Sequence, residues 1–243
     1  MNQVTVMAGK ELKGYFSSLS AYFFIGLFVT AAAGTFFFVE KFFGIGRAEL
    51  RGFFHWMPGL LAVLVPGITM RQWARENEMG SIELLMTLPV HSSRLVLGKF
   101  LGCMGLVATA LLFTIGIPIT AAIYGELDWG PVIGGYFAAI FLSAAYVAIG
   151  MWVSSWFSDQ FLAWIVSFVL CSVLAFMGHE RVLDWVADWP AWVAATLRFV
   201  GLWTRFQNIE RGVLDFRDIA YYVSVTFLFL FLNVCALRFR RWA

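Results

Sequence analysis

Long apolar stretches without a charged residue dominate the pattern of the chain. Six such blocks alternate with more polar segments, at 19–39, 52–70, 100–125, 129–158, 160–178 and 219–237. A transmembrane helix needs about 20 predominantly apolar residues, and each block is long enough for one. The alternating ten-residue pattern of a membrane β-barrel strand does not occur. Because backbone groups in lipid must be satisfied within the segment, the pattern predicts an all-α polytopic membrane protein with six transmembrane helices.

An amphipathic segment precedes the first block. Its apolar residues fall on one helical face, namely Val4, Met7, Ala8, Leu12, Tyr15, Phe16 and Leu19. Lys10 and Lys13 fall elsewhere, so 3–18 is predicted to form a helix in the plane of the membrane interface. A partly disordered tail is the alternative for this segment. The first apolar block is longer than the core of a signal peptide, which favours an uncleaved span over a cleaved signal.

Two connecting segments are too long to be simple turns. The first is 71–99, and the second is 179–218. The second contains an apolar run and Trp185, Trp189, Trp192 and Trp203, and tryptophan favours the membrane interface. We expect it to form short re-entrant helices at the outer face, because a segment of this length cannot build its own core.

The orientation follows from the basic residues between the blocks. Lys and Arg divide almost evenly between the two sides, but Arg238, Arg240 and Arg241 lie directly after the last block. Basic residues close to a span end favour the cytoplasm most strongly. Both termini and the 71–99 segment are therefore predicted to be cytoplasmic.

Composition supports a single membrane domain over 1–243 and excludes several other classes. Hydrophobic residues make up 61% of the 243 residues and charged residues only 13%, with a mean hydropathy of +0.80. The net charge of +2 gives no basic field for nucleic acid. Three cysteines lie inside apolar blocks, and the three histidines form no HExxH motif, so neither a disulfide framework nor a zinc protease site is indicated.

The segment 71–89 has the features of a short capped helix. Gly80 breaks the preceding turn, Ser81 is a good N-cap, and Glu83 falls in the first turn, where the helix dipole favours an anion. Leu84 and Leu85 contribute to an apolar surface, which ends at Pro89. Such a helix is suited to docking in the groove of a soluble partner, or alternatively to lying on lipid.

This stretch resembles the E-x-x-x-G-[ST]-[IL]-E-x-L-[LM]-x-x-P signature of the ATP-binding-cassette (ABC) type-2 exporter permeases. In that family the segment is the coupling helix, which docks into the ATPase subunit. The resemblance implies an ATPase-coupling role for Glu76, Glu78, Gly80, Ser81, Glu83, Leu84, Leu85 and Pro89.

A second stretch, 206–222, resembles the gliding-motility and nitrous-oxide-reductase accessory permeases within that family, and this resemblance implies a bacterial cytoplasmic (inner) membrane. Gly212 permits a turn there, and Asp215 is placed to cap the last helix. Asp218, three residues further on, is placed to reach back to that cap.

The energy source is predicted to lie outside this chain. The six blocks contain no charged residue of the kind that ion-coupled transporters use. The chain also lacks a P-loop, because neither Gly9-Lys10 nor Gly98-Lys99 has the required glycine upstream or a Ser or Thr downstream. We therefore expect no enzymatic activity and no cofactor in this chain, with ATP bound by a separate partner.

The resemblance implies a permease subunit that couples ATP hydrolysis to export or other outward-directed work. Its expected partners are two copies of an ABC ATPase, a second permease copy or a related permease chain, the lipid bilayer and an extracytoplasmic accessory protein, with no nucleic acid. An intramembrane enzyme or a structural membrane anchor of an assembly are the alternatives. Small residues at helix-packing spacing are consistent with packing within one subunit or with a dimer seam, at Gly98 and Gly102 and at Gly135, Ala139 and Ser143.

Overall fold

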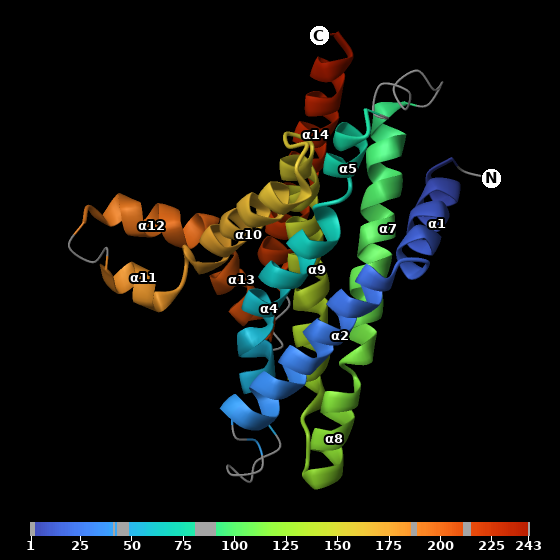
Figure 1. Cartoon of the computed structure of the whole chain (residues 1–243). Helices are drawn as coiled ribbons and strands as arrows, with labels where there is room; N and C mark the ends of the chain where they lie inside the picture. Colours follow the sequence, from blue (N-terminus) through green and yellow to red (C-terminus); the bar gives the residue numbers. More distant parts are fainter. Residues whose placement is uncertain are drawn as a thin grey trace.

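The computed structural model describes residues 3–40, 42, 49–80, 91–185, 189–210 and 215–242. Within these ranges every regular element is a helix, so the predicted all-α class is confirmed. Figure 1 shows an elongated bundle of long helices, with two short helices projecting from one side.

The first half of the chain contains α1 (Gln3–Phe16), α2 (Leu19–Gly34), the π-helical turn η1 (Thr35–Val39), α4 (Arg51–Thr69), α5 (Ala74–Glu78), α7 (Ser92–Phe113) and α8 (Gly116–Tyr124). The second half contains α9 (Trp129–Ser154), α10 (Gln160–Phe176), α11 (Glu180–Trp185), α12 (Ala191–Val200), α13 (Leu202–Glu210) and α14 (Phe216–Trp242).

Five helical stretches of the described chain are long and apolar enough to cross a membrane. They are Leu19–Val39, Arg51–Glu78, Ser92–Tyr124, Trp129–Ser154 and Phe216–Phe239. The sixth predicted span corresponds to α10, which is apolar but has only 17 residues. At 1.5 Å per residue it extends about 26 Å, slightly less than a hydrocarbon core of about 30 Å. Six spans are therefore not confirmed, although each apolar block does form a helix.

The helix boundaries differ from the sequence pattern mainly in the 71–99 segment. Its last residues are helical, because α7 begins at Ser92 rather than at the first uncharged position. Its first residues form a turn and then α5. A boundary drawn at the last charged residue misses these turns, because the helix includes Arg94 and Lys99.

The core is centred on α9, which packs against α4, α7, α10, α13 and α14. Its buried residues run almost without a break from Ala145 to Met151. Small residues let α4 approach closely: a Cβ on Gly135 would lie 2.5 Å from the Phe54 ring. A Cβ on Gly150 would lie 2.1 Å from the Thr69 hydroxyl. The small face of α9 therefore packs within this chain.

Helix α1 lies in a glycine groove of α7. The residues Gly98, Gly102 and Gly105 face α1, and a Cβ on Gly102 would lie 2.7 Å from the Cβ of Glu11. Met7, Leu12, Tyr15 and Phe16 of α1 pack on the core. The predicted N-terminal helix is thus present, with its apolar face turned to the helical bundle.

Replacing Gly102 with alanine is expected to destabilise the protein. The new Cβ meets the Cβ of Glu11, which is fixed to the backbone of α1, so the two helices must separate. Overpacking of this kind costs about 1–3 kcal/mol. Gly26→Ala is the matched control, because a Cβ there meets nothing within 4 Å and alanine favours a helix. Thermal unfolding in detergent measures both, and equal effects at the two positions would contradict this packing.

The predicted outer segment forms the short helices α11, α12 and α13. Figure 1 shows α11 and α12 projecting from the bundle. Trp185 of α11, Trp192 of α12 and Trp189 between the two helices are exposed. By contrast, Trp203 of α13 is buried, and its ring stacks on Phe176 with 5.3 Å between centroids. The interfacial role predicted for all four tryptophans is therefore wrong for Trp203, which anchors α13 to α10.

Two carboxylates fix the start of α14, the exposed Asp215 and the buried Asp218. Asp215 caps this helix as predicted, since its side chain accepts a hydrogen bond of 2.9 Å from the Arg217 backbone. The carboxylate of Asp218 binds α13 instead of serving mainly the cap. It accepts from Arg205 at 2.6 Å and from Asn208 at 3.1 Å. The role predicted for Asp218 is corrected accordingly, and Gly212 lies outside the described residues.

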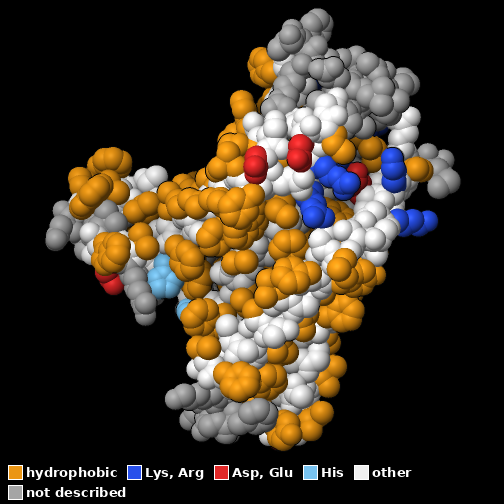
Figure 2. Space-filling view, in the orientation of Figure 1, with side chains coloured by type: hydrophobic (Ala, Val, Ile, Leu, Met, Phe, Trp, Pro, Cys, Tyr) orange, Lys and Arg blue, Asp and Glu red, His pale blue; other side chains and the backbone are white. Residues whose placement is uncertain are grey.

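On the face shown in Figure 2, charged side chains gather toward one end of the molecule, whereas Glu49, Arg51 and Glu126 are exposed near the other end. Figure 1 places the C-terminus, α5 and the start of α7 at the upper end, with the N-terminus on the same half. On the face shown in Figure 2, acidic and basic side chains cluster near this end, and hydrophobic side chains cover most of the surface below. This distribution is typical of a bundle whose middle lies in hydrocarbon.

Candidate coupling site

Only part of the predicted coupling motif falls within the described residues. Glu76, Glu78 and Gly80 are described, and they form α5 and its end. The residues Ser81, Glu83, Leu84, Leu85 and Pro89 lie outside the described residues.

Gly80 ends α5 in the manner that the sequence suggests. Its φ is +65°, a left-handed conformation that residues with a Cβ rarely adopt. The backbone N–H of Gly80 donates to Asn77 at 3.2 Å, and that of Met79 donates to Arg75 at 3.1 Å. A glycine in this conformation just after a helix is a common helix terminator. Gly80 therefore sets the direction in which the chain leaves α5.

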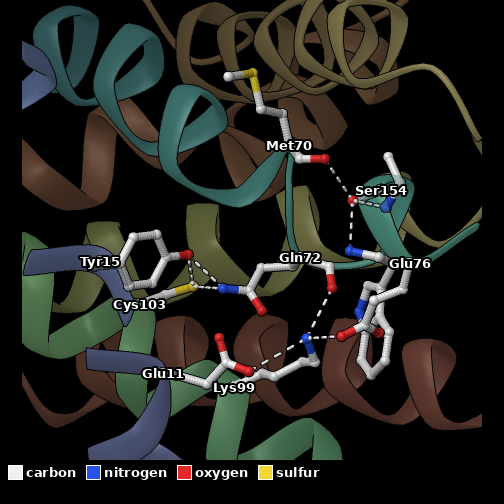
Figure 3. A network of polar contacts seen from close by, with 10 residues as sticks. Glu11, Tyr15, Met70, Gln72, Glu76, Lys99, Cys103 and Ser154 are labelled. Atoms are coloured by element: carbon white, nitrogen blue, oxygen red, sulfur yellow. Dashed lines mark hydrogen bonds and ion pairs between the residues drawn. The ribbon is translucent and has the colours of Figure 1, made fainter. Parts of the chain in front are cut away.

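A buried lysine joins three helices directly beside α5. Lys99 of α7 has a side chain that is only 4% exposed, and its Nζ lies 2.8 Å from Glu76 Oε1 and 3.4 Å from Glu11 Oε1. The same Nζ donates to the Gln72 carbonyl at 2.9 Å and lies 4.8 Å from the centre of the Trp73 ring. Figure 3 shows these groups converging on Lys99 of α7 from α1, α5 and the α4–α5 connection.

A buried serine holds the other side of the α4–α5 connection. Ser154 at the end of α9 accepts hydrogen bonds from the backbone N–H groups of Trp73 and Ala74, both at 3.1 Å. Its hydroxyl donates to the Met70 carbonyl at 2.9 Å. One side chain thus satisfies one backbone carbonyl at the end of α4 and two backbone N–H groups at the start of α5, which would otherwise be buried without partners.

A third contact links α1 to the same connection through uncharged groups. The Gln72 side-chain amide donates to the Tyr15 hydroxyl and to Cys103 Sγ, the latter at 3.1 Å. The Tyr15 hydroxyl in turn donates to the Ile68 carbonyl at 3.2 Å. Burial, and secondarily the proximity of Cys103, raises the pKa of Tyr15 well above its ordinary value. Tyr15 therefore remains a neutral hydrogen-bond donor at any physiological pH.

Helix α5 also contacts the connection between α9 and α10. The Asn77 side chain donates to the Phe157 carbonyl at 2.9 Å, and the Gln160 amide donates to Glu78 Oε2 at 2.9 Å. Two of the predicted motif residues, Glu76 and Glu78, therefore bind the protein's own helices in this structure. We call the set formed by Glu11, Tyr15, Gln72, Glu76, Lys99, Cys103 and Ser154 the coupling network.

The sequence indicated the acidic end of this network but not its centre. Lys99 was visible only as the last charge before an apolar block, and Tyr15 only as one residue of an apolar face. Ser154 carries no local signal, because its partners lie about 80 residues away in the sequence. The arrangement can act mechanically, because it fixes α1, α4, α5, α7 and α9 to one another. Of these helices, α5 and α7 flank residues 81–90 in the sequence. Among the described residues, no cluster of three His, Cys, Asp or Glu side chains offers a metal site.

Comparison with known families identifies a match for this sequence. The sequence model of a family described as ABC-2 family transporter protein matches residues 7–187, which is most of the chain. The match extends from α1 through α11 and includes every residue of the coupling network. No curated protein matches the chain.

Proposed function

The chain belongs to the ABC-2 family of transporter membrane proteins, and we propose from this that it is the transmembrane permease subunit of an ABC exporter. Membrane components of this family are typically not catalytic, and ATP is hydrolysed by a partner subunit. The family therefore implies an ABC ATPase as the partner of this chain. Binding and hydrolysis of ATP in that partner would drive outward-directed work through the membrane helices.

The coupling network is the observation that carries this proposal. The 81–90 segment is connected at one end to α5 and at the other to α7, and Lys99 bonds the two to each other. A displacement imposed on this segment would therefore move α5 and α7 as one body, together with α1 through Glu11. Without these bonds, the turn at 70–73 would absorb the movement before it reached α4 and α9.

Six membrane crossings, with both termini in the cytoplasm, belong to this proposal. Helix α10 would be the sixth crossing, and the short outer helices would complete the distance that its 17 residues leave. Support comes from the contacts of α5 with Phe157 and Gln160, since these place the α9–α10 connection at the same end as α5. The C-terminal end of α14 also lies toward that end (Figure 1), which supports a crossing by α10 between the α5 end and the outer helices.

Labelling of introduced cysteines tests this orientation. His91 and Trp189 are exposed residues at opposite ends of the proposed topology, whereas the neighbouring Ser92 is buried. With Cys103, Cys171 and Cys235 replaced by alanine, His91→Cys should react with an impermeant maleimide only after the membrane is opened. Trp189→Cys should react in intact cells. The opposite pattern would show that the orientation is inverted.

We further propose an assembly of two permease chains with two ATPase subunits, in a bacterial cytoplasmic membrane. The second permease would be another copy of this chain or a related one, and an extracytoplasmic accessory protein would complete some assemblies. The likeness of 206–222 to the gliding-motility and nitrous-oxide-reductase accessory permeases suggests outward-directed work of that kind. The proposal assigns no transported molecule.

The decisive experiment isolates the contribution of ATP hydrolysis. The tagged chain is purified from native membranes, the co-purifying ABC ATPase is identified, and its catalytic glutamate is replaced by glutamine. We expect the chain and the ATPase to co-purify in equal amounts. The glutamine variant of the ATPase should abolish both ATP hydrolysis and the outward-directed work that ATP drives in the complex. Normal activity with the inactive ATPase would support the membrane-anchor alternative. Activity of the chain without any ATPase would support the intramembrane-enzyme alternative, and either result would contradict the proposal.

A further inference from the structure

A polar cavity of about 350 Å³ lies between α1, the first turn of α2 and the α4–α5 connection. Its walls include Lys10 of α1, Ser18 and Ser20 at the start of α2, and Arg71 and Arg75 after α4. Lys99, Glu11 and Glu76 of the coupling network form part of its wall. The cavity is therefore shared by the elements that the network joins.

The described residues that line the cavity carry an excess of positive charge. Four of these side chains are basic and two are acidic, which leaves two positive charges in excess. Both carboxylates, Glu11 and Glu76, are bound to Lys99. Among the described residues, Lys10, Arg71 and Arg75 form no ion pair. Free cations brought together in one concave site are the usual means of binding a phosphate.

Arg71 is held in position as a binding residue would be. Its NH1 donates to the Ser20 hydroxyl at 2.6 Å, and this hydroxyl is also 2.7 Å from that of Ser18. Its buried Nε has no hydrogen-bond partner in the described structure. Keeping a guanidinium half-buried without an acidic partner costs free energy, which a bound anion would offset.

Apolar surface adjoins the cavity at the start of α2. Leu19, between the two serines, is 85% exposed, and Tyr22 and Phe23 on the next turn are 54% and 64% exposed. These side chains begin the first helical stretch that is long and apolar enough to cross a membrane, so their exposed surface suits contact with hydrocarbon. Figure 2 shows the same juxtaposition, with the charged cluster bordering a hydrophobic surface. A ligand that fills the cavity can therefore have an anionic head and an apolar tail.

We propose that this cavity binds the phosphate headgroup of an anionic phospholipid, whose acyl chains lie along α2. An anionic lipid fits better than a zwitterionic one, because both carboxylates that could hold a choline or ethanolamine group are already bound to Lys99. A lipid fits better than free phosphate, because the adjoining surface is apolar. The bound phosphate would join Lys10 on α1 to Arg71 and Arg75 beside α5. This inference does not depend on the ATPase partner.

Native mass spectrometry of the full-length protein in a neutral detergent tests the proposal. The protein is titrated separately with dioleoyl phosphatidylglycerol, dioleoyl phosphatidylcholine and inorganic phosphate. We expect phosphatidylglycerol to bind more tightly than phosphatidylcholine at one saturable site. A basic residue near an anionic lipid contributes a factor of about five in affinity, so Arg75→Gln should weaken binding about fivefold. The double variant Arg71→Gln/Arg75→Gln should weaken it about 25-fold, with Arg71→Lys retaining most of the affinity.

Arg238→Gln is the matched control for Arg75→Gln, since Arg238 is an exposed arginine at the same end of the molecule but outside the cavity. Its affinity should stay within twofold of the parent. Arg75 is exposed and makes no side-chain bond among the described residues, so its variant should fold normally. Parent-like binding by both Arg75→Gln and Lys10→Gln would overturn the proposal. So would equal binding of phosphatidylcholine, or displacement of phosphatidylglycerol by an equal concentration of inorganic phosphate, which would identify free phosphate as the ligand.

Discussion

Lys99→Met should uncouple this protein from its ATPase and lower its stability. The substitution keeps the volume of the side chain but removes the cation that lies between Glu11 and Glu76. Breaking a buried ion pair by removing one partner costs about 3–5 kcal/mol. Because the Glu11 and Glu76 side chains are 24% and 21% exposed, we expect a smaller loss of stability, of about 2–3 kcal/mol. Thermal unfolding of the purified protein measures this loss.

The same variant separates a structural role of Lys99 from a positioning role. In the triple variant Lys99→Met/Glu11→Gln/Glu76→Gln, no unpaired charge remains, so stability should return close to that of the parent. Stimulation of the ATPase should stay low, because residue 99 on α7 still forms no bond to residue 76 or to the Gln72 carbonyl. Lys99→Arg, which keeps the charge, should retain part of both. If Lys99→Met has the unfolding temperature of the parent and stimulates the ATPase as the parent does, the network has no role in transmission.

Changing Leu85 to aspartate should abolish binding of the ATPase while leaving the membrane helices intact. If 81–89 docks in a groove of the partner, the new carboxylate is desolvated there without a counter-charge. A misplaced charge at such a surface costs about 2–5 kcal/mol of binding free energy, or roughly 30-fold to several thousandfold in affinity. Glu83→Lys should have a similar effect on docking, although its effect on the helix itself is only about 0.3–1 kcal/mol.

Two control variants test whether the loss is specific to docking. Leu85→Met keeps an apolar side chain and should bind the ATPase like the parent. Glu126→Lys reverses an exposed charge between α8 and α9, at the opposite end of the molecule, and should have no effect on docking. Co-purification and stimulation of the ATPase are measured at equal expression. Parent-like binding by both Leu85→Asp and Glu83→Lys would mean that another element docks.

The sequence predicts the elements of this fold well, because lipid imposes strong local rules. Each apolar block forms a helix, since backbone groups in hydrocarbon have no other way to be satisfied. Asp215 and Gly80 were also recognisable, because caps and terminators depend on neighbouring residues in the sequence. The length of α10 was not, because its block includes the turn at Met177 and Gly178, which breaks the helix without a charge.

Sequence patterns could not predict the contacts between residues that are distant in the sequence. Trp203 has the composition of an interfacial residue, but it is buried because α13 folds back between α9 and α10. Lys99 reads as a boundary charge, yet α1 and α5 enclose it. The choice between a dimer seam and intrachain packing for Gly98 and Gly102 was likewise open until α1 was seen to fill the groove. Each of these contacts joins residues that are distant in the sequence, so no local pattern encodes it.

The glycine groove that receives α1 has a consequence for biosynthesis. Tyr15 and Cys103, which meet in the folded protein, are 88 residues apart in the sequence. At a translation rate of about 5–20 residues per second, α1 leaves the ribosome roughly 4–18 s before its binding surface on α7 has been synthesised. During this interval the two apolar helices α2 and α4 are synthesised and enter the membrane before α7. An amphipathic sequence suits α1 to this delay, because the membrane surface can shelter its apolar face until α7 arrives.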